Sequence, residues 1–128
     1  MIDHVSVAVS DLPRAMRFYE AVLGAIGYTM VDIRGTTVGF GKKYSEFWIN
    51  VRPDMKPLPP HSGAHICLRA RSQDQVDAFH AAALANGGAS DGAPGLRPHD
   101  GASGYYAAFI RDADGNRIEA VTFPGDDA

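Results

Sequence analysis

Four polar positions could together hold a divalent metal ion, because they recur at matching places in two halves of the chain. His4 and His65 each begin a segment in which apolar residues alternate, HVSVAV and HICLRA. Asn50 and Glu119 each stand in the middle of a later apolar segment, FWINV and RIEAV. Two imidazoles and one carboxylate suit Fe(II), Mn(II), Zn(II) or Ni(II) and leave positions open for water or a bidentate substrate. The sequence therefore predicts metal ligation by His4, His65 and Glu119. Asn50 is a weak oxygen ligand at most.

The elements that would carry His4 and Asn50 follow one another as βαβββ. Alternation over residues 4–9 predicts a strand with its valines buried. Ser10 or Asp11 can cap a helix whose apolar residues recur at helical spacing up to Gly24 or Gly27. Three further strands are predicted over residues 28–33, 36–41 and 46–52.

The same order returns after a proline-rich stretch at about residues 53–63, which reads as a linker. A strand over 64–70, a helix capped by Ser72 and strands over 105–111 and 117–123 are predicted, with a turn at 112–116. Sliding the chain so that His4 falls on His65 also superimposes Phe18 on Phe79. The second copy carries extra residues between positions 89 and 104, which predict a long, functional loop.

Composition favours a small molecule or another protein as partner. The chain has 128 residues, 45% of them hydrophobic, and a formal net charge of −3, so one compact domain is expected without affinity for nucleic acid or an anionic membrane. The single cysteine, the lack of a signal-like N-terminus and the lack of a long apolar run predict a cytoplasmic setting.

Two segments carry a family resemblance. DHVSVAVSDLPRAMRFYEAVLG and DADGNRIEAV resemble the opening and closing signatures of the vicinal oxygen chelate superfamily, which includes glyoxalases, bleomycin and fosfomycin resistance proteins and extradiol dioxygenases. The resemblance implies an α+β fold in which two tandem βαβββ modules form a curved half-barrel sheet. The modules would span about 1–55 and 63–125 within one domain of residues 1–128. It also assigns metal-ligand roles to His4, His65 and Glu119.

The resemblance leaves the reaction open. Glyoxalases that hold their metal with four protein ligands usually have a glutamate where this chain has Asn50. This difference argues against classical glyoxalase I activity. The leading hypothesis is a metal-dependent lyase or isomerase, transferase or dioxygenase, with Glu119 catalytic and a substrate that chelates the metal through two oxygens. The rival is a metal-free binding protein of the bleomycin-resistance type.

Other residues are expected to contact the substrate. Asn50, Trp48 and Arg117 share the face of the ligands by strand alternation, and His99 could reach over the cavity from the inserted segment. Of the adjacent Tyr105 and Tyr106, only one can face the cavity. A homodimer is expected because half-barrels leave sheet edges uncovered, and His4 could share a site with His65 and Glu119 of its own chain or of a partner.

Overall fold

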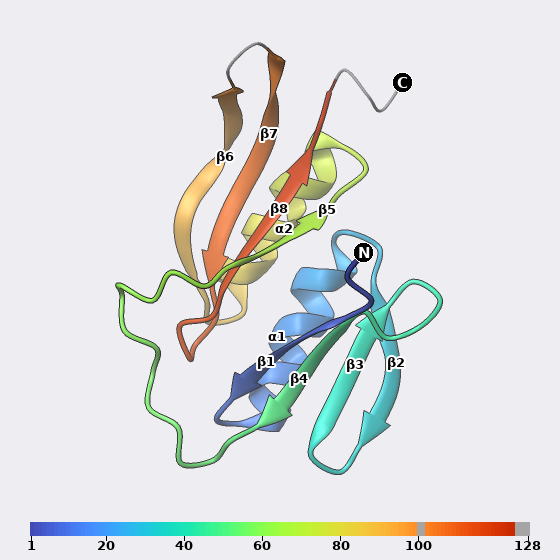
Figure 1. The fold of residues 1–128 in the computed structure, drawn as a ribbon, viewed down its shortest axis with the longest axis vertical. Coiled ribbons are helices and arrows are strands. Elements are labelled where there is room, and N and C mark those ends of the chain that lie inside the picture. The colour runs from blue at the N-terminus through green and yellow to red at the C-terminus, as the bar shows by residue number, and fades with distance from the viewer. Residues whose placement is uncertain (100–101, 125–128) are drawn as a thin grey trace.

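The computed structural model describes residues 1–99 and 102–124, without the side chains of residues 99, 102 and 103. In these residues the elements follow in the order β1 (Val5–Val9), α1 (Leu12–Gly24), β2 (Thr29–Arg34), β3 (Thr37–Gly41), β4 (Phe47–Val51), β5 (Ile66–Arg69), α2 (Gln73–Ala85), β6 (Ala89–His99), β7 (Ala102–Arg111) and β8 (Arg117–Thr122). This is βαβββ twice, which confirms the predicted α+β fold of two tandem modules (Figure 1).

Each module forms its own four-stranded mixed sheet. The strand orders are β1-β4-β3-β2 and β5-β8-β7-β6. In both sheets the first strand of the module is an edge strand that runs parallel to the last, while the other pairs are antiparallel. This topology brings the start of each module, with its histidine, beside the start of the last strand of that module.

The helices begin and end where local chemistry requires. Asp11, one of the two predicted caps, accepts a hydrogen bond from the Arg14 backbone N–H at 3.0 Å at the start of α1. Ser72 caps α2 as predicted, accepting from the Gln75 N–H at 3.2 Å. Beyond the helices Gly27 and Gly87 adopt φ angles of 92° and 91°, a left-handed conformation in which glycine costs least.

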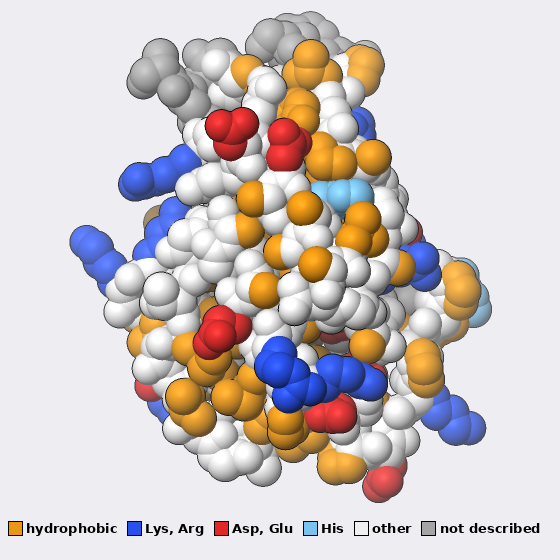
Figure 2. All heavy atoms as spheres, turned by 180° about the vertical axis from the view of Figure 1, so that it is seen from behind, with side chains coloured by type: hydrophobic (Ala, Val, Ile, Leu, Met, Phe, Trp, Pro, Cys, Tyr) orange, Lys and Arg blue, Asp and Glu red, His pale blue; other side chains and the backbone are white. Residues whose placement is uncertain are grey.

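The helices form one layer and the sheets another. Both helices lie behind the sheets in Figure 1 and contact each other. The buried faces carry large side chains such as Tyr19, Phe47, Phe79 and Ile118, which form one hydrophobic core. Among the described residues, no helix covers the other face of either sheet (Figure 1). Figure 2 shows the molecule from behind, where acidic and basic side chains are interspersed with apolar ones.

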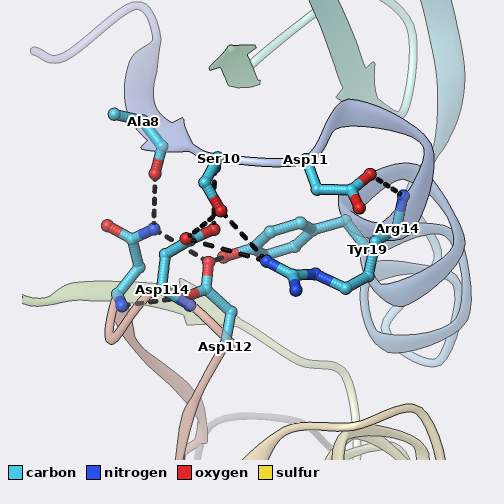
Figure 3. A network of polar contacts seen from close by, with 8 residues as sticks. Ala8, Ser10, Asp11, Arg14, Tyr19, Asp112 and Asp114 are labelled. Atoms are coloured by element: carbon cyan, nitrogen blue, oxygen red, sulfur yellow. Dashed lines mark hydrogen bonds and ion pairs between the residues drawn. The ribbon is translucent and has the colours of Figure 1, made fainter. Parts of the chain in front are cut away.

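A polar network joins the two modules (Figure 3). The turn after β7 approaches the junction of β1 and α1, where Asp114 accepts hydrogen bonds from the Ser10 hydroxyl at 2.6 Å and the Ser10 N–H at 3.0 Å. Beside it, the Tyr19 hydroxyl donates to Asp112 at 2.6 Å, and the Asn116 amide donates to the Ala8 carbonyl at 2.8 Å. The turn that the sequence predicts at 112–116 is therefore also an intermodule contact.

The extra residues of the second module form strands and not the predicted loop. Residues 89–99 belong to β6 and 102–111 to β7, which pair as a long antiparallel hairpin with several register shifts. Arg97 stabilises the irregular part of β6 by donating to the carbonyls of Ala93 at 2.7 Å and Gly95 at 2.8 Å. Backbone pairing across the hairpin makes β structure possible in a segment whose glycines and prolines predict a loop.

The predicted linker holds no helix or strand between residues 52 and 65. Two hydrogen bonds hold it against the second module. The Leu58 N–H donates to the Asp114 carbonyl at 2.8 Å, and Arg117 donates to the Pro60 carbonyl at 2.6 Å. Within the described residues, the model has no helix of the length and hydropathy needed to cross a membrane.

Candidate functional site

His65 and Glu119 meet on the open face of the second sheet. β5 and β8 pair in parallel register with Cys67 beside Glu119, and His65 precedes β5 by one residue. His65 Nε2 lies 3.1 Å from Glu119 Oε1. The side chain of Glu119 is 9% exposed and that of His65 50% exposed. A shielded carboxylate beside an accessible imidazole has the donor chemistry that a divalent metal requires.

Cys67 adds a thiol to this pair. Partial burial of the thiol, and then the negative charge and hydrogen-bond acceptance of Glu119, raise the pKa of Cys67 to about 12 although the residue as a whole is exposed. The thiol is therefore protonated at neutral pH and can donate to the carboxylate. Sequence reasoning did not predict this contact.

His4 lies apart from that pair. Its Nδ1 is 2.7 Å from Asp3 Oδ1, and its side chain is 55% exposed. It lines an open cavity of about 560 Å³ on the first sheet together with Ser6, Arg34 and Trp48. Among the described residues, no group of three or more His, Cys, Asp or Glu side chains is placed to hold a metal ion. The chain thus brings together two of the three predicted ligands.

The strand register changes the equivalence between the two modules. Ser6 pairs with Trp48 in the first sheet, whereas Cys67 pairs with Glu119 in the second. Across the antiparallel pairs, Gly39 opposes Trp48 and Phe109 opposes Glu119. The counterpart of Glu119 is therefore Trp48, and the sequence-based match with Asn50 is wrong by two residues.

Asn50 has a structural role in this arrangement. Its Nδ2 donates to Ser6 Oγ at 2.6 Å and to the Val7 carbonyl at 3.1 Å, which ties β4 to β1. Its Oδ1 is buried and makes no hydrogen bond. Trp48 lines the cavity of His4, as expected of a pocket wall, and the Arg34 guanidinium lies 4.9 Å from the centroid of its ring.

The remaining predicted contacts divide between described and undescribed side chains. Arg117 lines a cavity of about 220 Å³ together with His65 and Asp91. The side chain of His99 lies outside the described residues, so its role as a substrate contact stays a prediction.

The structure decides between the two adjacent tyrosines. Tyr105 lines a cavity of about 280 Å³ with Glu119 and Phe123, whereas the Tyr106 hydroxyl donates to Asp77 of α2 at 2.6 Å. Asp91, Phe109 and Phe123 line these cavities although sequence reasoning did not select them. Alternation along 105–111 and 117–123 could have found the two phenylalanines. Asp91 lies in the segment that was predicted to be a loop.

Comparison with known proteins identifies the family. Residues 1–120 match the model of the Glyoxalase/Bleomycin resistance protein/Dioxygenase superfamily. A crystal structure of a glyoxalase/bleomycin resistance protein from Albidiferax ferrireducens T118 is 37% identical, covers 93% of this chain and 96% of that chain, and superposes with a TM-score of 0.79. The chain belongs to the glyoxalase/bleomycin resistance/dioxygenase superfamily.

More distant structures share the fold. The fosfomycin resistance protein FosX from Mesorhizobium loti is 20% identical, covers 96% of this chain and 92% of that chain, and has a TM-score of 0.66. A glyoxalase I variant from Zea mays is 18% identical, covers 92% of this chain and 45% of that chain, and has a TM-score of 0.72. At these identities the likeness shows the fold alone. No match was found among curated proteins.

Proposed function

We propose that the protein is a divalent-metal-dependent enzyme of glyoxalase or dioxygenase type, which acts on a small substrate that offers two neighbouring oxygens to the metal. The observation that carries this proposal is the contact of His65 Nε2 with Glu119 Oε1 at 3.1 Å on an open sheet face. The superfamily to which the chain belongs includes proteins named as glyoxalases and dioxygenases. The reaction would be that of a lyase or isomerase, a transferase or a dioxygenase.

The fit of a metal to these residues is good but incomplete within one chain. His65 and Glu119 supply a nitrogen and an oxygen donor, and a mostly buried carboxylate is stabilised by a neighbouring cation. His4 would be the third ligand, yet it lines a different cavity from these two residues. We propose a homodimer in which His4 of one subunit joins His65 and Glu119 of the other, since each sheet leaves an open face and an edge strand.

The roles of the chain's own side chains follow from their surroundings. A bound divalent ion would act as a Lewis acid toward the substrate oxygens. Glu119 would serve as a ligand and as the proton acceptor, because its carboxylate borders the cavity that Tyr105 and Phe123 line. Cys67, protonated at neutral pH, would hold that carboxylate by donating to it. Asn50 is occupied with Ser6 and Val7 and would not move a proton.

The second candidate function is metal-free binding of a small molecule. It is favoured by the cavity of about 560 Å³ on the first sheet, where Trp48 and Arg34 form a cation–π pair and could contact an aromatic ligand. In this case Trp48 and not the His65–Glu119 pair would carry the affinity.

Metal analysis separates the two candidates. Protein purified without chelator is expected to contain near-stoichiometric Fe, Mn, Zn or Ni, and His65→Ala and Glu119→Ala are each expected to lose it, because two ligands alone bind weakly. His80→Ala is the matched control, since His80 Nε2 contacts Ser90 Oγ at 2.8 Å on the helix side of the sheet. A wild-type protein that holds no metal even after incubation with each ion would contradict the proposal and favour metal-free binding.

A further inference from the structure

The cavity of about 220 Å³ beside His65 is lined by the charged residues Asp91 and Arg117, and Arg111 contacts Asp91 next to it. Asp91 Oδ1 lies 3.4 Å from Arg111 Nε, and Asp91 Oδ2 lies 3.9 Å from Arg117 Nε. Two guanidinium groups thus share one carboxylate, which gives these three side chains a formal charge of +1, with the carboxylate of Glu119 beyond them against His65. A further anion would be attracted there.

The arginines also have donors to spare. Arg111 Nε is buried, but the Arg111 side chain as a whole is 39% exposed, so its accessible donors are those at the end of the guanidinium. Arg117 uses its Nη2 to donate to the Pro60 carbonyl. A guanidinium carries five N–H donors in a planar fork that fits a carboxylate with two parallel hydrogen bonds. The contacts with Asp91 and Pro60 therefore hold the arginines in place without using all of their donors.

The opposite end of the same face is apolar and aromatic. Cys67, Tyr105, Val121 and Phe123 line a cavity of about 280 Å³ on the other side of Glu119. The ring centroids of Tyr105 and Phe123 lie 6.2 Å apart, and the Arg69 guanidinium covers Phe123 at 4.5 Å. Such a surface takes up an apolar or aromatic group and shields it from water.

The strand spacing sets these ends in line. Arg117, Glu119 and Val121 are alternate residues of β8 and share one face, so successive members lie roughly 7 Å apart. A ligand along β8 would place its anionic group at Arg117, its middle at the contact of His65 with Glu119, and its apolar group at Phe123.

We infer that the site binds an amphipathic carboxylate, with the acid held by Arg111 and Arg117 and an apolar or aromatic group held by Tyr105 and Phe123. This inference rests on the proposed function, because the oxygens that the metal would chelate belong to the middle of that ligand. It adds the substrate class and assigns recognition to Arg111, Tyr105 and Phe123.

Binding to chelator-treated protein tests the inference without the metal. The probes are 12-phenyldodecanoate, which is long enough for the roughly 20 Å from Arg117 to Phe123, its neutral amide and dodecanoate, measured by isothermal titration calorimetry. Wild-type protein is expected to bind 12-phenyldodecanoate about tenfold or more tightly than the amide, the range expected for a charged hydrogen bond, and more tightly than dodecanoate. Arg117→Gln and Arg111→Gln are expected to remove most of the preference for the acid, while Phe123→Ala weakens acid and amide alike.

Arg71→Gln is the matched control, since Arg71 is exposed at the start of the segment before α2 and lies in neither cavity. Circular dichroism of every variant verifies folding. Equal affinity of wild-type protein for the acid and the amide, or no binding of 12-phenyldodecanoate, would overturn the inference. Loss of metal binding with retained selectivity for the acid would instead count against the proposed enzyme and leave the carboxylate site standing.

Discussion

At the scale of single residues, the most constrained ionisable pair lies between the modules and not at the candidate metal site. Tyr19 is fully buried and donates to the buried Asp112 at 2.6 Å. Burial raises the pKa of Asp112, and the hydrogen bonds from Tyr19 and Asn116 oppose that rise. The same contact, after burial itself, raises the pKa of Tyr19 well above its usual value, so the phenol stays protonated and keeps donating.

Tyr19→Phe is therefore expected to destabilise the protein in a pH-dependent way. Loss of a hydrogen bond to a charged group costs about 2 kcal/mol, and it raises the pKa of Asp112 further. A carboxyl group whose pKa is raised by folding stabilises the folded state in acid, and that contribution is lost as pH rises through the folded-state pKa. The destabilisation caused by Tyr19→Phe is therefore expected to be larger at about pH 8 than at about pH 4. Urea denaturation of both proteins at the two pH values measures it. A cost that is equal at both, or larger in acid, would contradict the argument.

At the scale of elements, the turn between β7 and β8 combines a glycine in a left-handed conformation with a close contact. Gly115 has a φ angle of 87°, and a Cβ atom there would lie 3.1 Å from the Leu58 carbonyl oxygen of the linker. The turn also carries Asp112, Asp114 and Asn116, which contact the first module.

Gly115→Ala is expected to lower the free energy of unfolding by about 1–2 kcal/mol, the usual cost of a left-handed non-glycine residue. Gly35→Ala is the control, because Gly35 has no atom within 4 Å of the Cβ position and does not have a positive φ. Chemical denaturation should therefore separate the two alanine variants. Similar stability for both would show that the turn relaxes without cost.

Much of each element could be predicted from its own residues, because alternation marks strands such as β1 and a capping Asp11 or Ser72 marks a helix start. The pairing of His65 with Glu119 followed from the repeat. Three features could not be found in this way, since they depend on pairing between distant segments. They are the register that makes Trp48 of the first module the counterpart of Glu119 of the second, the β6–β7 hairpin, and the separation of His4 from the other ligands.

At the scale of the whole molecule, the two modules pack against each other within the chain. α1 contacts α2, and the Asp114–Ser10 contact joins the second module to the first. The open faces of both sheets are left outside this contact. The proposed homodimer would use them to complete two equivalent sites, each with ligands from both subunits.

Mixing two defective variants tests that arrangement. A His4→Ala chain keeps His65 and Glu119, and a Glu119→Ala chain keeps His4, so a dimer of one of each would hold one intact site. After denaturation and joint refolding, random pairing is expected to restore about a quarter of the wild-type metal content, with none in either variant alone. Analytical ultracentrifugation that shows only monomer at micromolar concentration, or a mixture without metal, would contradict the shared site.

The first module has the indole of Trp48 where the second module has the carboxylate of Glu119. The protein therefore carries an intrinsic fluorophore on the open face of its first sheet. Trp48 is the single tryptophan of the chain, and it borders the cavity of His4 beneath the Arg34 guanidinium. Its emission therefore originates from one known place, and a molecule that displaces Arg34 from the indole would change it. Fluorescence quenching can thus follow events on the first sheet separately from those at Glu119.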